Sequence, residues 1–214
     1  MLENKKILIF DLGGVLIDLH VERTFDAFAH LGVDRRCLSE GGSPMNSSIM
    51  QFDRGDIAAA EMFGRIASFL PEKAAALPGK ELEKRLAAAW NLMLGEFAPC
   101  KFRRLRELRE RGYRVLMLSN TNELHWPEIE RKFKESIGEP IDAFFDSLYL
   151  SFRMNLRKPE REIFLELLSS ECADAADCIF FDDSAANCEA ARLVGIDAVL
   201  MERNAEWSDS IMTE

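Results

Sequence analysis

The sequence is poor in cysteine: its 214 residues include only five, Cys37, Cys100, Cys172, Cys178 and Cys188. Their number is odd, and their spacing contains neither a CxxC pair nor another pattern typical of zinc ligands. A disulfide framework and a structural zinc site are therefore excluded. We expect these side chains to act as small buried hydrophobes in a reducing compartment.

An excess of basic residues and a long apolar run are also missing. The formal net charge is −10, whereas a surface that binds the phosphodiester backbone needs clustered Lys and Arg. The longest apolar stretch near the N-terminus, residues 7–17, is interrupted by Asp11 and is too short for a signal sequence or a membrane span. We therefore expect no nucleic-acid partner, no membrane partner and a cytoplasmic location.

What the sequence does contain is a repeated order of strand, polar turn and helix. Apolar runs typical of buried parallel strands occupy residues 7–10, 113–119, 178–181 and 197–201, and amphipathic helices are expected at 101–111 and 185–194. Strands that alternate with helices through right-handed crossovers form a doubly wound parallel α/β sheet, Rossmann-like in architecture.

Polar side chains follow three of these strands at their carboxyl ends: Asp11, Ser119, Asp182 and Asp183. Because ligands of such sheets bind beyond the carboxyl ends of the strands, we expect these four side chains to surround one crevice.

Residues between the first two strands form a long insertion without a strand-like run. Helical periodicity is present at 21–31, 59–70 and 80–94. An insertion of this size is too long for an ordinary crossover and predicts a helical cap over the crevice. We expect a catalytic core made of residues 1–18 and 99–214 and a cap made of residues 19–98, which excludes water and selects the substrate.

Four motifs in a fixed order carry a family resemblance: Asp11, Ser119, Lys158 in the string Arg157-Lys158-Pro159, and the pair Asp182 and Asp183. Together with the inserted cap they resemble the haloacid dehalogenase-like hydrolase superfamily over nearly the whole chain. The strings FDLGGV at 10–15, LSNTN at 118–122 and FFDDS at 180–184 resemble the branch that contains bacterial glucose-1-phosphate phosphatases.

The resemblance implies a magnesium-dependent phosphatase for a small phosphorylated metabolite, with a hexose 1-phosphate as the leading substrate. Asp11 would be the nucleophile that forms an aspartyl-phosphate, because a carboxylate held in line with a neutralised phosphate can attack phosphorus. Mg²⁺ prefers oxygen ligands, and Asp11, Asp183 and the carbonyl of Gly13 would hold it, with Asp182 acting nearby or through water.

The remaining roles concern the phosphate group. Lys158 would contact a phosphate oxygen and Asp11 while charge moves between them. Ser119 and the backbone amide of Asn120 would donate hydrogen bonds to the other phosphate oxygens.

One position departs from the family pattern. Where the family has a second aspartate two residues after the nucleophile, this sequence has Gly13, and loss of a general acid and base commonly costs a factor of about 10² to 10⁴. The branch that the sequence resembles also lacks this aspartate. Asp18, His20 or a cap residue could supply the missing acid, or the substrate could have a good leaving group.

Other functions and other roles stay open in the sequence. A non-catalytic phosphometabolite-binding protein is one alternative; a haloacid dehalogenase is another, disfavoured because Asp182 and Asp183 would be hard to keep ionised beside Asp11 without a metal. Asp53 or Arg54 could contact substrate. Trp90 is expected to belong to the core of the cap, whereas His20 and His125 could be structural or functional and receive no role; no oligomeric state is favoured. The basic residues at 101–111 are expected to form the solvated face of a helix.

Overall fold

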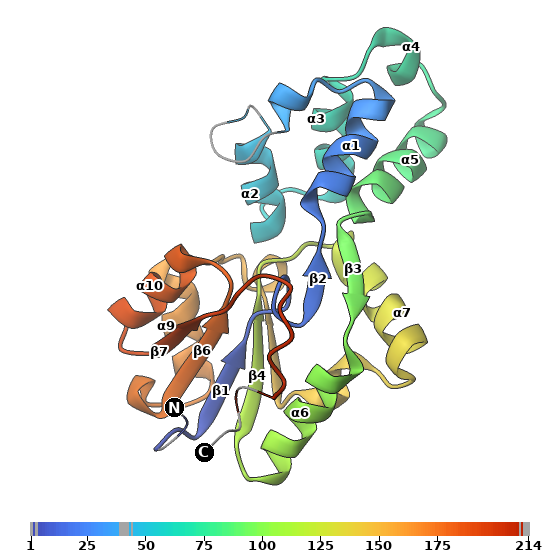
Figure 1. The fold of residues 1–214 in the computed structure, drawn as a ribbon. Helices are drawn as coiled ribbons and strands as arrows, with labels where there is room; N and C mark the ends of the chain where they lie inside the picture. The colour runs from blue at the N-terminus through green and yellow to red at the C-terminus, as the bar shows by residue number, and fades with distance from the viewer. Residues whose placement is uncertain (1, 3, 39–42, 44, 210, 212–214) are drawn as a thin grey trace.

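The computed structural model describes residues 2, 4–38, 43, 45–209 and 211, and a parallel five-stranded sheet forms its centre (Figure 1). The spatial order of the strands is β5-β4-β1-β6-β7. In chain order they are β1 (Ile7–Phe10), β4 (Arg114–Ser119), β5 (Ser147–Leu150), β6 (Cys178–Asp182) and β7 (Asp197–Leu200). The predicted doubly wound α/β fold is confirmed, with β1 in the middle of the sheet.

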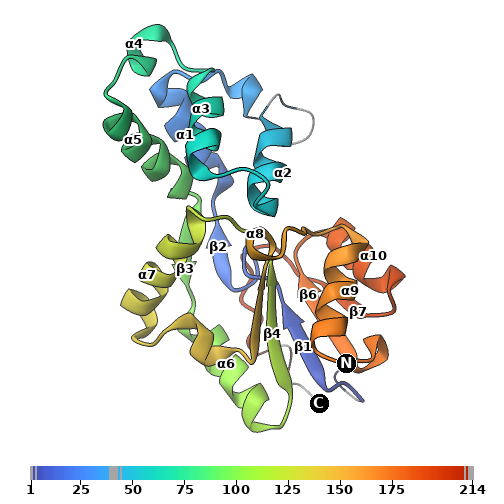
Figure 2. The ribbon, with the colours of Figure 1, turned by 180° about the vertical axis from the view of Figure 1, so that it is seen from behind.

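Helices cover both faces of this sheet, as Figures 1 and 2 show. Leu8 and Phe10 belong to the core of one face, whereas Ile7 and Ile9 belong to the core of the other, because successive side chains of a strand point to opposite sides. The first face is covered by α6 (Pro99–Glu110) and α7 (His125–Ile137). The second is covered by α9 (Arg161–Ser170) and α10 (Ala185–Leu193).

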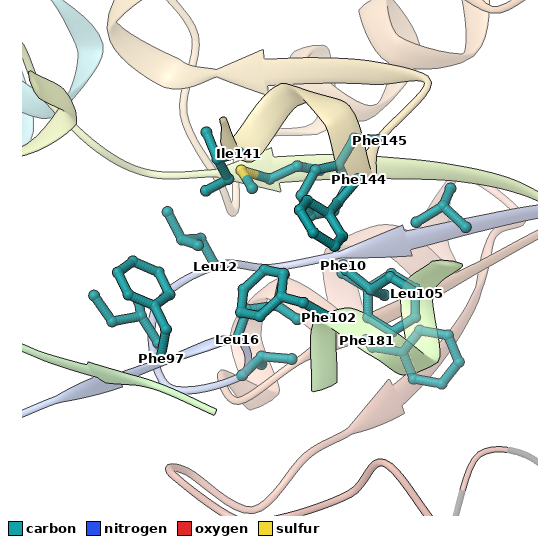
Figure 3. Close-up of a cluster of buried hydrophobic side chains, with 14 of the residues drawn as sticks. Phe10, Leu12, Leu16, Phe97, Phe102, Leu105, Ile141, Phe144, Phe145 and Phe181 are labelled. Atoms are coloured by element: carbon teal, nitrogen blue, oxygen red, sulfur yellow. The ribbon is translucent and has the colours of Figure 1, made fainter. Parts of the chain in front are cut away.

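Aromatic side chains fill the first of these cores (Figure 3). Phe10 stacks on Phe181 with ring centroids 4.8 Å apart, and Phe102 meets Phe133 edge to face at 4.7 Å. Every side chain of β1 is buried, and full burial of one such side chain stabilises a fold by about 1.5–3 kcal/mol. The end of β1, where Asp11 follows, is therefore firmly held.

Five helices follow the first strands and form a separate layer above the sheet in Figure 1. They are α1 (Val21–Leu31), α2 (Asn46–Arg54), α3 (Ala59–Ala67), α4 (Glu72–Ala75) and α5 (Gly79–Asn91), with a short 3₁₀ turn η1 (Arg35–Cys37) after α1. Phe28, Phe52, Met62, Ile66 and Trp90 form part of their own buried cluster. The three helices expected from periodicity are present, but two end three residues early, at Ala67 and Asn91, and α2 was not predicted.

A short antiparallel ribbon joins these helices to the sheet. It consists of β2 (Ile17–Leu19) and β3 (Leu94–Phe97), with Ile17 opposite Phe97 and Leu19 opposite Leu94. The expectation that no strand lies between residues 19 and 99 was wrong. These two strands are stabilised by hydrogen bonds between short segments that lie far apart in the chain. Neither strand contains a long apolar run that would have predicted it.

Several smaller elements complete the fold: η2 (Ile141–Phe144), α8 (Ser151–Met154) and η3 (Ala175–Asp177). Strand β5 was also absent from the prediction, because three of its four residues are only half-buried and it lies at the edge of the sheet. No helix in the described part of the chain combines the length and apolarity that crossing a bilayer requires.

Two expectations about individual side chains need correction. Lys101 is not solvated: it is buried, and its Nζ donates to the carbonyl oxygen of Val15 at 2.8 Å. Of the cysteines, Cys178 and Cys188 are buried as expected, but Cys172 is exposed and the other two are half-buried. All five are free thiols.

Candidate active site

The carboxyl edge of the sheet gathers the predicted polar side chains. Asp11 follows β1, Ser119 ends β4, and Asp182 ends β6 with Asp183 directly after it. The backbone N–H of Asp11 donates to the carbonyl oxygen of Phe181 at 2.9 Å, so the pairing of β1 with β6 continues to Asp11. Parallel pairing thus brings side chains 170 residues apart in sequence to one edge.

Lys158 is buried between two of these carboxylates. Its Nζ lies 2.7 Å from Asp11 Oδ1 and 2.7 Å from Asp182 Oδ2, and it donates to the carbonyl oxygen of Leu118 at 2.7 Å. Only 1% of the Lys158 side chain is exposed. An ammonium group has three protons to donate, and these three oxygens accept all of them.

The Asn120 side chain holds the backbone of Lys158. Asn120 Oδ1 accepts from the Lys158 N–H at 2.9 Å, and Asn120 Nδ2 donates to the Lys158 carbonyl oxygen at 2.9 Å. This pair of bonds fixes the loop after α8 against the end of β4. The Asn120 side chain is therefore a positioning group for Lys158, a role that the sequence did not reveal.

Asp182 is fully buried and has protein partners on both oxygens. Oδ1 accepts from the Ser184 N–H at 2.8 Å and from Asn187 Nδ2 at 3.0 Å. Oδ2 accepts from Lys158 and from Asn187 Nδ2 at 3.1 Å. Because these bonds satisfy the carboxylate, Asp182 serves to orient Lys158 and the start of α10.

Asp183 faces the same space from the start of the following loop. Its Oδ2 pairs with Arg203 Nε at 2.5 Å. Gly14 lies against it with φ +76°, and a Cβ on Gly14 would stand 2.4 Å from Asp183 Oδ2. Only glycine fits there, since a side chain would both strain the backbone and displace the carboxylate.

Three carboxylates have ligand atoms within 4.8 Å of one another: Asp11, Asp182 and Asp183. These are hard oxygen donors of the kind that Mg²⁺ binds. Lys158 and Arg203 pair with the three acids, so one negative charge remains before any phosphate enters. The donor chemistry and this charge fit a divalent cation.

Burial controls the titration of the pair at the centre of the site. Loss of solvent raises the pKa of Asp11 to about 7, against the opposing effect of Lys158, and Asp182 adds to the increase. Burial alone would lower the pKa of Lys158, but the carboxylates of Asp11 and Asp182 raise it. Lys158 therefore stays charged, whereas Asp11 needs a further cation to be fully ionised at neutral pH.

The position of the missing aspartate is covered by an apolar side chain. A Cβ on Gly13 would lie 2.6 Å from Leu19 Cδ1, so a larger residue at position 13 requires Leu19 to move. Asp18 and His20, the suggested substitute acids, both lie close to Gly95 in the ribbon. Neither lines the cavity beside Gly13.

This cavity has a volume of about 440 Å³ and lies between the cap helices and the sheet edge. Gly13, Ser119 and Asn120 line its lower end, and cap side chains such as Phe25 and Ile49 line the rest. Core residues at the sheet edge and side chains of α1 and α2 thus line one cavity.

Contacts at the end of α2 attach the cap to the core. Asp53 Oδ1 accepts from Asn122 Nδ2 at 3.0 Å, and Arg54 forms an ion pair with Glu160. The Ser151 hydroxyl donates to the carbonyl oxygen of Asp53. The two cap residues suggested as substrate contacts therefore have partners in the core.

His125, whose role the sequence left open, has protein partners on both ring nitrogens. Its Nε2 lies 3.1 Å from the carbonyl oxygen of Trp90, and its Nδ1 lies 3.3 Å from Asn122 Nδ2. Burial lowers the pKa of His125 to about 4, so the ring is neutral, with Nε2 donating and Nδ1 accepting.

Sequence reasoning missed the supporting residues Arg203, Asn187 and Asn122. Asn187 stands three residues after Ser184, whose hydroxyl accepts from its N–H as the N-cap of α10, and this cap pattern was a usable signal. Arg203 lies in an irregular segment after β7, and no local pattern connects it to Asp183.

Comparisons with known proteins agree with this geometry. Residues 5–195 match the family model of haloacid dehalogenase-like hydrolases. The chain is 26% identical to a D-ribitol-5-phosphate phosphatase of Bacteroides thetaiotaomicron, over 96% of each protein. It is 29% identical to a sesquiterpene phosphatase of Aspergillus oryzae, over 89% of this chain and 87% of that protein.

A solved structure is similar over almost its whole length. A HAD family enzyme from Bacteroides thetaiotaomicron, in complex with magnesium and inorganic phosphate, superimposes with a TM-score of 0.84 at 30% identity. The alignment covers 98% of this chain and 100% of that chain.

Proposed function

The chain belongs to the haloacid dehalogenase-like hydrolase family, and from that premise we propose that it hydrolyses a small phosphomonoester through an aspartyl-phosphate on Asp11. It is a phosphatase of that family, and Mg²⁺ is its cofactor. One observation carries the proposal: the Asp11 carboxylate stands at the carboxyl edge of the sheet, 2.7 Å from the buried Lys158, and the residues that follow it, Leu12 and Gly13, line the cavity.

In the first step an oxygen of Asp11 attacks phosphorus, and the bond from phosphorus to the ester oxygen breaks. Lys158 keeps Asp11 in place and can shift toward the phosphate oxygens as the carboxylate loses charge. Ser119 and the N–H of Asn120 donate to the phosphate. Water then attacks the acyl phosphate, which releases inorganic phosphate and restores the carboxylate.

Asp11, Asp183 and the carbonyl oxygen of Gly13 would hold the cation, with Asp182 supporting them through Lys158. Bound Mg²⁺ neutralises phosphate charge and keeps the reacting groups in line. The raised pKa of Asp11 supports this assignment, because an added positive charge favours the ionised carboxylate that the attack requires.

No side chain replaces the missing general acid in this proposal. Leu19 covers Gly13, and Asp18 and His20 do not line the cavity. The departing oxygen therefore takes its proton from water, and within one class of ester we expect turnover to rise with the acidity of the leaving alcohol.

The domain division follows the same proposal. We propose residues 1–18 and 99–214 as the catalytic core and residues 19–98 as the cap; the separate hydrophobic cluster of α1 to α5 supports it. Polyol and sesquiterpene phosphates are the substrates that two relatives' names give, and a hexose 1-phosphate stays a prediction. A cytoplasmic location and the absence of a nucleic-acid partner also stay predictions.

The test is phosphate release from a panel of sugar phosphates, polyol phosphates and para-nitrophenyl phosphate, with Mg²⁺ and with a chelator. We expect release that depends on Mg²⁺. Metal-independent release of halide from 2-haloacids would instead identify a dehalogenase, and binding of phosphate esters without any turnover would identify a non-catalytic protein.

A further inference from the structure

The walls of the cavity above the sheet edge are mainly apolar. From the cap come side chains that include Phe25, Ile49 and Trp90, and from the core come Leu12 and Ile129. Among the described residues that line it there is no Lys or Arg. A volume of about 440 Å³ lies within the range of about 300–1,000 Å³ that is typical of small-molecule sites.

Polar side chains in these walls are largely engaged with the protein. The Thr24 hydroxyl donates to the carbonyl oxygen of Ala89 at 2.9 Å and accepts from the Met93 N–H at 3.0 Å. Both ring nitrogens of His125 have partners. Asp53 accepts from Asn122, and burial raises its pKa, which disfavours a free carboxylate in the cavity.

A ligand rich in hydroxyl groups would gain few hydrogen bonds here. Asn46 is the remaining polar side chain of the cap wall, since Thr24 and Asp53 are engaged. Each hydroxyl that is moved from water to an apolar wall without a partner loses free energy, whereas a methylene group gains about 0.8 kcal/mol on burial.

The polar end of the same cavity is the phosphate end of the site. Ser119, Asn120 and Thr121 line it together with Gly13, which stands two residues after Asp11. A single ligand can therefore place its phosphate at the sheet edge and the rest of its body among the cap side chains.

We propose that the substrate is a phosphomonoester with an apolar body, of the alkyl or isoprenyl class, seated between Ile49 and Phe25 of the cap and Leu12 of the core. The inference rests on the proposed phosphatase function and specifies its substrate class. It also predicts that a hexose 1-phosphate is a poor substrate, because the cap offers few free partners to the sugar hydroxyls.

The experiment separates binding from turnover. A series of n-alkylphosphonates from ethyl to octyl competes with para-nitrophenyl phosphate in the presence of Mg²⁺, and the inhibition constant is measured for each. All members of the series carry the same phosphonate head group. Differences between their inhibition constants therefore report the contacts of the alkyl chain with the cavity. We expect the inhibition constant to fall about fourfold for each methylene until the cavity is full, and a pentitol phosphate to inhibit more weakly than the hexyl compound.

A matched pair of variants locates the effect in the cavity. Ile49→Ser shortens a cavity wall, and we expect it to weaken octylphosphonate about tenfold and ethylphosphonate by less than twofold. Met50→Ser changes the next residue of α2, which is exposed and does not line the cavity. It should leave the whole series unchanged.

The possible outcomes separate the two proposals. Hydrolysis of para-nitrophenyl phosphate with inhibition constants that vary less than twofold along the series would overturn the apolar substrate class and keep the phosphatase. Absence of hydrolysis would overturn the phosphatase, and calorimetry with the same phosphonates would then test the cavity directly: chain-length dependence supports it and a flat series overturns it.

Discussion

The two sides of the cavity are built on different physical principles. At the sheet edge, Asp11, Asp182 and Lys158 are buried charges held by hydrogen bonds of 2.7–3.1 Å. On the cap side, Phe25, Ile49 and their neighbours form walls by shape and apolarity, with few free polar groups. In the proposed function, chemistry depends on buried charges whose geometry tolerates little change, whereas substrate selection depends on apolar side chains that can be exchanged.

The largest expected effect is at the nucleophile. Asp11→Asn keeps the shape of the edge but removes the attacking carboxylate, so phosphate release should fall on the order of 10⁴-fold or more. Steady-state assays with para-nitrophenyl phosphate measure it. Asp197→Asn, in the exposed residue that begins β7, is the control and should keep full activity. Substantial turnover by Asp11→Asn would reassign the nucleophile.

Lys158→Met should affect both stability and turnover. The variant leaves the carboxylates of Asp11 and Asp182 buried without their cation, and removal of one partner from a buried ion pair commonly costs about 3–5 kcal/mol. Turnover should fall about 10²- to 10³-fold. Urea denaturation with a chelator and kinetic assays measure the two effects.

Lys6→Met is the control for Lys158. Lys6 is an exposed lysine directly before β1, and it pairs with Asp177 at the surface. If Lys158→Met proved as stable as the unmodified protein, the ion pairs of Lys158 would not stabilise the sheet edge.

Two buried groups that lie on opposite sides of the contact between core and cap, Asp11 at the sheet edge and His125 against Trp90 of the cap, should respond to pH with opposite signs. In metal-free protein the pKa of Asp11 is raised to about 7 from about 3.9 in the unfolded chain, so stability should fall as pH rises from 4 through 7. The pKa of His125 is lowered to about 4, so its contribution is present above pH 6.5 and is lost as pH falls toward 4. The effect is at most about 4 kcal/mol for Asp11 and about 3 kcal/mol for His125.

Denaturation at a series of pH values, with a chelator, measures both limbs. In Asp11→Asn the free energy of unfolding should no longer fall as pH rises through 7. In His125→Gln it should no longer fall as pH decreases from 6.5 toward 4. His30→Gln, in an exposed residue of α1, should change neither. Identical pH profiles for all four proteins would contradict the burial argument.

A smaller effect is expected where the two sides meet, at Gly13 and Leu19. Leu19→Ala makes room, and Gly13→Asp then adds a carboxyl group beside the leaving oxygen. We expect the double variant to raise kcat for methyl phosphate by up to about 10²-fold and to add a basic limb to its pH profile. Gly13→Asp alone should gain less, because a Cβ there meets Leu19. An unchanged profile in the double variant would show that space is not what limits position 13.

Much of the catalytic edge could be predicted, because strand patterns determine which residues stand at carboxyl ends. Asp11, Ser119 and Asp182 follow from that rule. Lys158 does not: it lies in a segment between β5 and α9 without periodicity, and only the family resemblance identified it. Arg203 lies after the last strand, and its pairing with Asp183 depends on a tertiary path that no local pattern encodes.

The cap was predicted in outline but not in its decisive details. The string NSSIMQFDR of α2 lacks strong helix formers at its start, so the helix that carries Ile49 was missed. The ribbon of β2 and β3 is stabilised by pairing between residues far apart in the chain. Without the ribbon, the covering of Gly13 by Leu19 could not be foreseen.

The central place of β1 has a consequence for synthesis of the chain. Ile9 of β1 pairs with Leu116 and Phe180, so β1 is synthesised more than a hundred residues before either of its partners in the sheet. Residues 28–90 contain the whole buried cluster of the helices above the sheet and can associate earlier, because contacts near in sequence form fastest. The helical layer above the sheet is therefore expected to fold while Asp11 still lacks its counter-ion Lys158.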